Sequence, residues 1–154
     1  MEIGGGDNPD ANHPNLDIRE IPGVDIVHDL EWGTLPWHDG HATKIKCIHA
    51  MEHISHAAGQ ALLRESFRIL RPGGHLFLMI CDLDFILERL QEEGLVWWWV
   101  TSLFHDESIT PGGFHRWAYN WATILDELLA AGFTGVEHLG YWNRWDLKVH
   151  AYKP

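Results

Sequence analysis

The feature that most constrains the fold is an unbroken apolar run, His75 to Cys81 (HLFLMIC), that directly follows Pro72-Gly73-Gly74. A run of this length without polar alternation is typical of a strand buried on both faces, as in a parallel sheet covered by helices. The Pro-Gly-Gly sequence ends the helical pattern before it. The run therefore predicts an inner strand of an α/β protein.

The segments around this run alternate between strand-like and helix-like patterns, which predicts helices packed on a mainly parallel sheet. Ser55 is a plausible helix N-cap, and Gly132 is suited to the left-handed residue that follows a helix. Leu147, Val149 and Ala151 alternate with polar residues, as expected for a sheet-edge strand. The expected strands are 44–50, 75–81, 135–141 and 146–152, and the expected helices are 55–70, 84–93 and 120–131.

Length and composition indicate a single globular domain spanning residues 1–154. A chain of 154 residues with 45% hydrophobic residues forms one core comfortably, and no stretch approaches the roughly 18 apolar residues of a membrane span. The N-terminus has no basic and apolar signal region, so we expect a cytoplasmic protein. Cys47 and Cys81 lie within strand-like runs and are expected to be free thiols.

The charge balance argues against nucleic acid as a partner. Against 22 acidic residues the chain has 11 Lys and Arg, which gives a formal net charge of -11. A charge of this sign repels phosphate backbones at long range. We therefore expect a small-molecule partner, with neither nucleic acid nor membrane.

Three strand ends near the N-terminus carry the residues of a nucleoside site. Gly4-Gly5-Gly6 lets backbone amides approach a ligand closely, and Asp17 can accept hydrogen bonds from two ribose hydroxyls. Asp29 follows a third short strand and offers an acceptor for an exocyclic amine, and Leu30 offers an apolar face for a base. Open α/β sheets bind ligands where such strand ends meet.

Seven short motifs occur along the chain in a familiar order. They are Glu2-Ile3-Gly4-Gly5-Gly6-Asp7-Asn8-Pro9, Asn15-Leu16-Asp17, Val24-Asp25-Ile26-Val27-His28-Asp29-Leu30, Leu35-Pro36-Trp37, His49-Ala50-Met51-Glu52-His53, Leu70-Arg71-Pro72-Gly73-Gly74 and Ala131-Gly132-Phe133. In this order they resemble class I S-adenosylmethionine-dependent methyltransferases, and most closely the small type-11-like branch. The resemblance implies a Rossmann-like doubly wound sheet, mainly parallel with an antiparallel C-terminal strand. It also implies S-adenosylmethionine as the cofactor, with S-adenosylhomocysteine as its product.

The resemblance also implies a role for individual residues. The backbone of the glycine loop after the first strand would hold the methionine part of the cofactor, and Asp17 would bind the ribose. Asp29 would contact the adenine amine. Ile18 and Leu30 would pack on the two faces of the adenine. The backbone around His49 would lie under the sulfonium. The implied cofactor-binding residues are Glu2, Ile3, Gly4, Gly5, Gly6, Asn8, Asp17, Ile18, Asp29, Leu30 and His49.

Three departures from the family pattern shape further expectations. The chain begins at its first strand, so the expected fold lacks the N-terminal helix, and its cofactor cleft is either open to solvent or covered by another segment. Asn8 replaces the third loop glycine, and the stretch from Gly6 to Asp17 is too short for a crossover helix. An irregular, aromatic-rich insertion at about 94–117 is the expected cover. We also expect a homodimer whose contact includes part of Trp97 to Phe104.

The candidates for catalysis are His49 and His115, with His105 as a further candidate. A neutral histidine with a pKa near 7 can take the proton of an acceptor hydroxyl or amine, and Arg116 can meet an anionic acceptor. The triplet Trp97 to Trp99 is expected to be mostly packing. The expected activity is methyl transfer to a small molecule that the sequence does not identify.

Two alternatives to an active methyltransferase remain open. One is a catalytically degenerate domain that serves as a cofactor-binding or protein-interaction module. The other is a zinc hydrolase, because His49-x-x-Glu52-His53 fits the inverted zinc-peptidase pattern, in which both histidines lie on one helix. His49 closes a strand-like run and Ser55 looks like the next helix start, so the sequence predicts no metal site.

Overall fold

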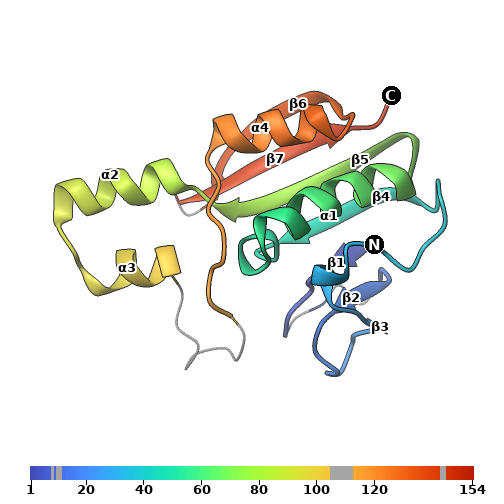
Figure 1. Ribbon diagram of the computed structural model, residues 1–154, viewed down its shortest axis with the longest axis horizontal. Coiled ribbons are helices and arrows are strands. Elements are labelled where there is room, and N and C mark those ends of the chain that lie inside the picture. The colour runs from blue at the N-terminus through green and yellow to red at the C-terminus, as the bar shows by residue number, and fades with distance from the viewer. Residues whose placement is uncertain (8, 10–11, 105–112, 143–144) are drawn as a thin grey trace.

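A computed structural model describes the chain except for residues 8, 10–11, 105–112 and 143–144 (Figure 1). The strands are β1 (Glu2–Ile3), β2 (Asn15–Asp17), β3 (Ile26–Val27), β4 (Ala42–Ile48), β5 (Leu70–Cys81), β6 (Thr134–Trp142) and β7 (Asp146–Tyr152). The helices are α1 (His56–Ile69), α2 (Leu83–Glu93), α3 (Trp97–Phe104) and α4 (Trp121–Ala130), with single 3-10 turns η1 (Leu30–Trp32) and η2 (Met51–His53). Within the described ranges, the helices are all too short or too polar to cross a membrane.

The described strands form one sheet in the order β3-β2-β1-β4-β5-β7-β6. Of these strands only β7 runs antiparallel to its neighbours, β5 and β6. From β1 the chain moves outward to β2 and β3 and then returns to β4 and β5 on the other side. This is the doubly wound sheet with an antiparallel C-terminal strand that the sequence predicts. The reversal at β1 and β4 is the point where such sheets bind ligands.

The helix boundaries follow from capping residues that the sequence shows. Ser55 caps α1, because its side chain accepts a hydrogen bond from the backbone N–H of Ala58. Asn120 and Thr123 form a reciprocal capping box at the start of α4. Gly132 follows α4 at φ 102°, a conformation that favours glycine. The three predicted helices, 55–70, 84–93 and 120–131, are confirmed as α1, α2 and α4 to within one residue of their predicted ends.

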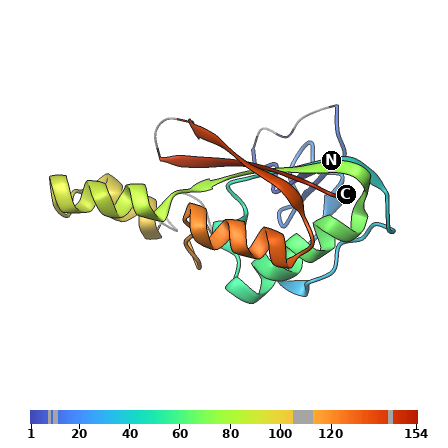
Figure 2. The same cartoon turned by 90° about the horizontal axis from the view of Figure 1, so that it is seen from above.

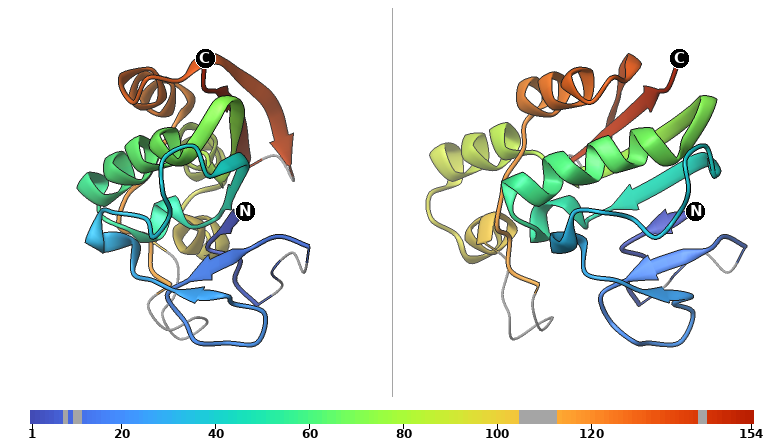
Figure 3. Two further views of the ribbon diagram at one scale, coloured as in Figure 1. Left: turned by 90° about the vertical axis from the view of Figure 1, so that its right-hand side faces the viewer. Right: turned by 45° about the vertical axis from the view of Figure 1, so that its right-hand side comes forward.

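The core lies between the sheet and the helices α1 and α4, which cover the same face (Figure 2). Leu76, Leu78 and Ile80 of β5 and Val149 of β7 point into this core and are at most 1% exposed. The alternation along β7 is therefore real, but the expectation of a sheet-edge strand is wrong. β7 lies between β5 and β6, and its alternation reflects the packing of one sheet face against helices. Figure 3 shows the short strands β1–β3 at one end of the sheet and the C-terminal hairpin, formed by β6 and β7, at the other.

The aromatic-rich insertion is more regular than the sequence predicts. Residues 97–104 form the helix α3, which pairs with α2 and projects with it beyond the sheet (Figure 1). Trp99 is buried and donates a hydrogen bond to Glu93 Oε2 at 2.8 Å, but Trp97 and Trp98 are 66% and 56% exposed. The expected packing role therefore holds for Trp99 and is wrong for its two neighbours. The helix is almost uniformly apolar, so it has no hydrophobic period by which sequence could reveal it.

Candidate functional site

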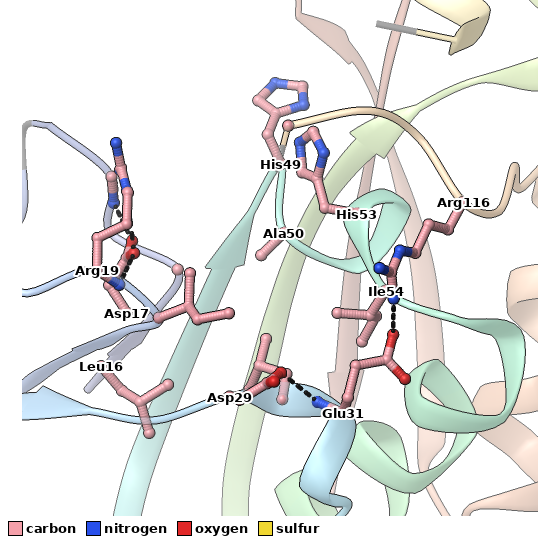
Figure 4. Close-up of a pocket in the computed structure, with 15 residues that line it drawn as sticks. Leu16, Asp17, Arg19, Asp29, Glu31, His49, Ala50, His53, Ile54 and Arg116 are labelled. Atoms are coloured by element: carbon pink, nitrogen blue, oxygen red, sulfur yellow. Dashed lines mark hydrogen bonds and ion pairs between the residues drawn. The ribbon is translucent and has the colours of Figure 1, made fainter. Parts of the chain in front are cut away.

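A pocket of about 370 Å³ opens at the carboxyl ends of β1, β2 and β4, at the reversal of the sheet (Figure 4). A volume of this size lies within the range of small-molecule sites. Its walls come from the loop after β1, the segments after β2 and β3, the turn after β4, and residues Gly113 and Arg116 of the segment before α4. The sequence predicts that the first three of these meet, and the structure brings them together.

Two loop glycines bring the backbone close to this pocket. Gly4 and Gly6 line the pocket with φ angles of 69° and 62°. In this left-handed region a residue with a side chain would be strained, whereas glycine is not. A Cβ atom at Gly4 would lie 2.5 Å from the Cβ of Ala50, at the end of β4. Glycine at position 4 therefore allows the first loop to pack directly against the turn after β4.

Asp17 is the acidic residue at the end of β2, and it is only 6% exposed. Its Oδ2 accepts a hydrogen bond from the backbone N–H of Gly6 at 3.0 Å, which ties β2 to the glycine loop. Its Oδ1 accepts hydrogen bonds from the backbone N–H of Arg19 at 3.0 Å and from Arg19 Nε at 3.2 Å. The Arg19 guanidinium also pairs with Asp7 at 3.0 Å. The Nε donor belongs to a side chain, so a ligand hydroxyl can replace it without moving the backbone.

The segment after β3 supplies a second carboxylate and an apolar wall. Asp29 caps η1, where its Oδ1 accepts a hydrogen bond from the backbone N–H of Glu31 at 2.9 Å. Leu30 packs partly against the core, and Ile18 faces the pocket while 61% exposed. These side chains give the pocket an apolar surface beside a hydrogen-bond acceptor.

The same turn η1 also carries Glu31, which forms an ion pair with Arg116, with 2.8 Å between Oε1 and Nη1. Glu31 also accepts hydrogen bonds from the backbone N–H and the hydroxyl of Ser55, each at 2.7 Å. Partial burial raises the pKa of Glu31, but the hydrogen bonds from Ser55 and Arg116 outweigh it and lower that pKa. The carboxylate therefore holds Arg116 at the pocket, where a polar ligand group can reach it.

His49 lines the pocket directly after β4, with a φ angle of 47° that is uncommon for a residue with a side chain. Its Nδ1 is 2.9 Å from Glu52 Oε1, and its Nε2 is 3.5 Å from Asp146 Oδ1. Burial lowers the pKa of His49, but the nearby Asp146 and Glu52 carboxylates and the Cys81 thiol outweigh it and raise the pKa to about 12. The imidazole is therefore positively charged near neutral pH, not neutral as the sequence analysis expects.

The pocket gathers seven of the residues that the sequence proposes for the cofactor. These are Gly4, Gly6, Asp17, Ile18, Asp29, Leu30 and His49. Glu2 is buried beside Lys46, at 2.8 Å, and Ile3 lies in the core. Gly5 packs against Asn15, and none of these three residues is on the pocket wall. Asn8 lies outside the described residues.

The histidines expected for catalysis occupy different places. His115 lies behind the pocket wall, near Glu52 and Cys81, and its ring centroid is 4.8 Å from that of His53. His105 lies outside the described residues. His49 precedes the single 3-10 turn η2 and is not on a helix with His53, so the geometry of the inverted zinc-peptidase motif is missing from this described segment.

Sequence reasoning missed several residues of the site. Arg19 and Glu31 lie next to residues that it did identify, so proximity in sequence was an available signal. No sequence signal indicated that Cys81 and Asp146 lie side by side, because they meet only through the antiparallel register of β5 and β7. Cys81 does end the apolar run of β5, and strand ends of this kind point to the site.

Comparison with known proteins agrees with this geometry. Residues 10–78 match the family described as "Methyltransferase domain" (Methyltransf_11). Among curated protein sequences, none matches the chain at a significant level.

Solved structures of similar fold include three described as S-adenosylmethionine-dependent methyltransferases. One from Thermotoga maritima is 18% identical with a TM-score of 0.67, and the match covers 99% of this chain and 81% of that one. One from Archaeoglobus fulgidus is 12% identical with a TM-score of 0.69, covering 99% and 84%. One from Mesorhizobium loti is 14% identical with a TM-score of 0.65, covering 99% and 89%.

The sheet order, the pocket at its reversal and these structural similarities define the class I methyltransferase fold. Within that class, residues 10–78 carry the sequence pattern of the methyltransferase domain family. The resemblance on which the sequence analysis relies is thereby confirmed.

Proposed function

We propose that this protein is an S-adenosylmethionine-dependent methyltransferase that acts on a small molecule. The observation that carries the proposal is the convergence of the glycine loop, Asp17 and Asp29 on one pocket at the reversal of the sheet. The sequence match over residues 10–78 supports the same activity. The fold alone would not, because one fold supports many functions.

The residues of the pocket fit the donor molecule. The backbone at Gly4 and Gly6 suits the methionine part, and Asp17 is placed for the ribose once Arg19 Nε gives up its hydrogen bond. Asp29 suits the adenine amine, and Ile18 and Leu30 supply apolar contact for the base. When bound, S-adenosylmethionine supplies a methyl group that its sulfonium already activates.

The chain's contribution to transfer is mainly positioning and electrostatics. Transfer forms a bond from the acceptor atom to the methyl carbon and breaks the carbon–sulfur bond, whose electron pair stays on sulfur. Glu52 and Asp146 carry two negative charges against the one positive charge of His49. This net negative charge beneath the pocket favours a cationic donor. A protonated His49 does not accept the acceptor's proton.

The acceptor side of the pocket favours a small polar molecule. Arg116 and Glu31 present opposite charges at its wall, and the net charge of -11 disfavours nucleic acid. We also propose that a second copy of the chain covers the exposed aromatic residues of α3. Trp97, Trp98 and Phe104 support this, because each is more than half exposed.

The experiment that tests the proposed function is calorimetric titration with S-adenosylmethionine and S-adenosylhomocysteine. Binding at about 100 times the dissociation constant should add about 2.7 kcal/mol to the free energy of unfolding. Asp17→Asn should weaken binding at least about tenfold, equivalent to about 1.4 kcal/mol. Asp126→Asn, on the exposed side of α4, is the matched control and should bind like the wild type.

Two results would contradict the proposal. The first is no heat of binding from folded protein with either compound at millimolar concentration. The second is tight binding of both without methyl transfer to hydroxyl, amine or thiol acceptors in a broad small-molecule panel. That second result would favour the degenerate binding module.

A further inference from the structure

Three ionisable side chains from separate strands meet beneath the pocket. His49 follows β4, Cys81 ends β5, and Asp146 begins β7. The antiparallel register pairs Cys81 directly with Asp146, and the backbone N–H of His49 bonds to the carbonyl of Met79 on β5. One ligand atom from each of the three side chains lies within 4.8 Å of the other two.

Asp146 has an unsatisfied oxygen in this cluster. The residue is 3% exposed, and among the described residues its Oδ1 has no hydrogen-bond partner. The facing donor, His49 Nε2, is 3.5 Å away, beyond the usual range of about 2.7–3.2 Å for an N–H to oxygen bond. A buried carboxylate oxygen without a partner is costly, so a group that contacts Asp146 and His49 at the same time would stabilise the cluster.

A metal ion fits the distance between the His49 and Asp146 ligand atoms. Zinc binds imidazole nitrogen and carboxylate oxygen at about 2.0–2.2 Å and thiolate sulfur at about 2.3 Å, which places ligand atoms roughly 3.3–3.8 Å apart in a tetrahedron. The 3.5 Å between His49 Nε2 and Asp146 Oδ1 lies in this range. We propose that His49, Cys81 and Asp146 bind one divalent transition-metal ion of the zinc class, which displaces the protons of His49 Nε2 and of the Cys81 thiol into water. This proposal replaces the sequence-based expectation of a protein without a metal site.

Glu52 supports this assignment from the other side of the imidazole. Its Oε1 is 2.9 Å from His49 Nδ1, which fixes the ring with Nε2 directed at the cluster. Metal-binding histidines usually make such a bond with their second nitrogen. Glu52, Cys81 and His115 form another compact grouping, but an ion there would compete with His49 for Glu52. We therefore place the ion between His49, Cys81 and Asp146.

Three protein ligands leave one position of a tetrahedral ion for another molecule. This step rests on the proposed function: the fourth ligand is the hydroxyl or thiol of the methyl acceptor. The ion makes such a group easier to deprotonate, and the proton passes to water. The acceptor is then an oxygen or sulfur anion beside the pocket that holds the methyl donor.

Cobalt titration of the reduced, chelator-treated protein tests the site. The wild type should bind one Co²⁺ per chain, with visible bands of tetrahedral cobalt and a thiolate charge-transfer band in the near ultraviolet. Cys81→Ala should remove the charge-transfer band. Asp146→Asn and Glu52→Gln should each weaken binding by about 10- to 100-fold. Cys47→Ala, which removes a core thiol outside the cluster, should leave both sets of bands unchanged.

A second measurement needs no variant and remains valid if the substitutions unfold the protein. Zn²⁺ should slow alkylation of Cys81 by iodoacetamide in the folded wild type, whereas Cys47, which is 1% exposed, should stay unmodified with or without the ion. Absence of a charge-transfer band at excess Co²⁺, or no protection of Cys81, would overturn the proposal. Loss of cobalt binding in His115→Ala would also contradict it, because the ion would then lie in the other grouping. S-adenosylhomocysteine binding is measured on the same samples, so failure of the metal site and failure of the proposed function are distinguishable.

Discussion

Arg19 lies across the carboxylate of Asp17, with its Nε 3.2 Å from Oδ1, the oxygen that the proposed function assigns to a ribose hydroxyl. The Arg19 side chain is 31% exposed, and it also pairs with Asp7. Ion pairs of this exposure contribute about 0.2–1 kcal/mol. The guanidinium is therefore a weak competitor for the ligand.

Arg19→Ala should strengthen S-adenosylhomocysteine binding, because the ligand no longer has to displace the guanidinium. The expected gain is about two- to fivefold in the dissociation constant, equivalent to about 0.4–1 kcal/mol. Calorimetry measures it directly. Arg64→Ala, an exposed arginine on α1, is the control and should not change affinity. Weaker binding in Arg19→Ala would mean that the guanidinium contacts the ligand.

Gly4→Ala should destabilise the fold more than Gly73→Ala. Both glycines have a positive φ, 69° and 76°, so both substitutions carry a similar backbone strain of about 1–2 kcal/mol. The new Cβ at position 4 would also lie 2.5 Å from the Cβ of Ala50, whereas nothing lies within 4 Å at position 73. Urea unfolding should show the larger loss for Gly4→Ala. Equal losses would show that the contact with Ala50 relaxes freely.

Glu65 makes folding stability depend on pH. It accepts hydrogen bonds from Arg68 and from the backbone N–H of Leu35, and its pKa is lowered, mainly by the bond from Arg68. A lowered pKa gives stability that is present above the ordinary value of 4.5 and is lost as pH falls through the lowered value. Glu65→Gln should therefore cost about 1–3 kcal/mol at neutral pH and less in acid.

Denaturant unfolding of the wild type and Glu65→Gln across this pH range measures the difference. Glu20→Gln, at an exposed position, serves as the control and should follow the wild type at every pH. A difference between Glu65→Gln and the wild type that stays constant from neutral pH into acid would exclude a charge-dependent role for Glu65.

Trp98→Ser should weaken self-association, because Trp98 is 56% exposed on α3 beside the exposed Trp97. Light scattering should show a dimeric wild type at high micromolar concentration and a larger monomer fraction for the variant. Trp32→Ser, an exposed tryptophan on η1, is the control and should leave the dimer intact. A wild type that is monomeric at these concentrations would remove the dimer proposal.

Local sequence signals predicted the parts of the fold that local chemistry decides. Ser55 and Gly132 mark helix ends because capping depends on a few neighbouring residues. His49 was placed at a strand end for the same reason, and Asp17 and Asp29 were found because each directly follows a strand. These predictions concern what each residue does within its own segment.

The parts that sequence could not predict depend on contacts between distant segments. The position of β7 inside the sheet requires β6 to pair outside it, and no local pattern distinguishes this from an edge strand. The charge of His49 depends on Asp146, which belongs to another strand. The helix α3 was missed because an evenly apolar segment shows no period.

The insertion of β7 between β5 and β6 makes the last part of the chain essential to the floor of the pocket. Asp146 reaches His49 only when the C-terminal hairpin has docked, so a nascent chain that ends before this strand lacks the charged cluster. Contacts between such distant positions form late, because the intervening chain must be ordered first. Opening of the hairpin in the folded protein would likewise remove the carboxylate while leaving the glycine loop in place. If the proposed function holds, competence for methyl transfer is in this way coupled to completion of the fold.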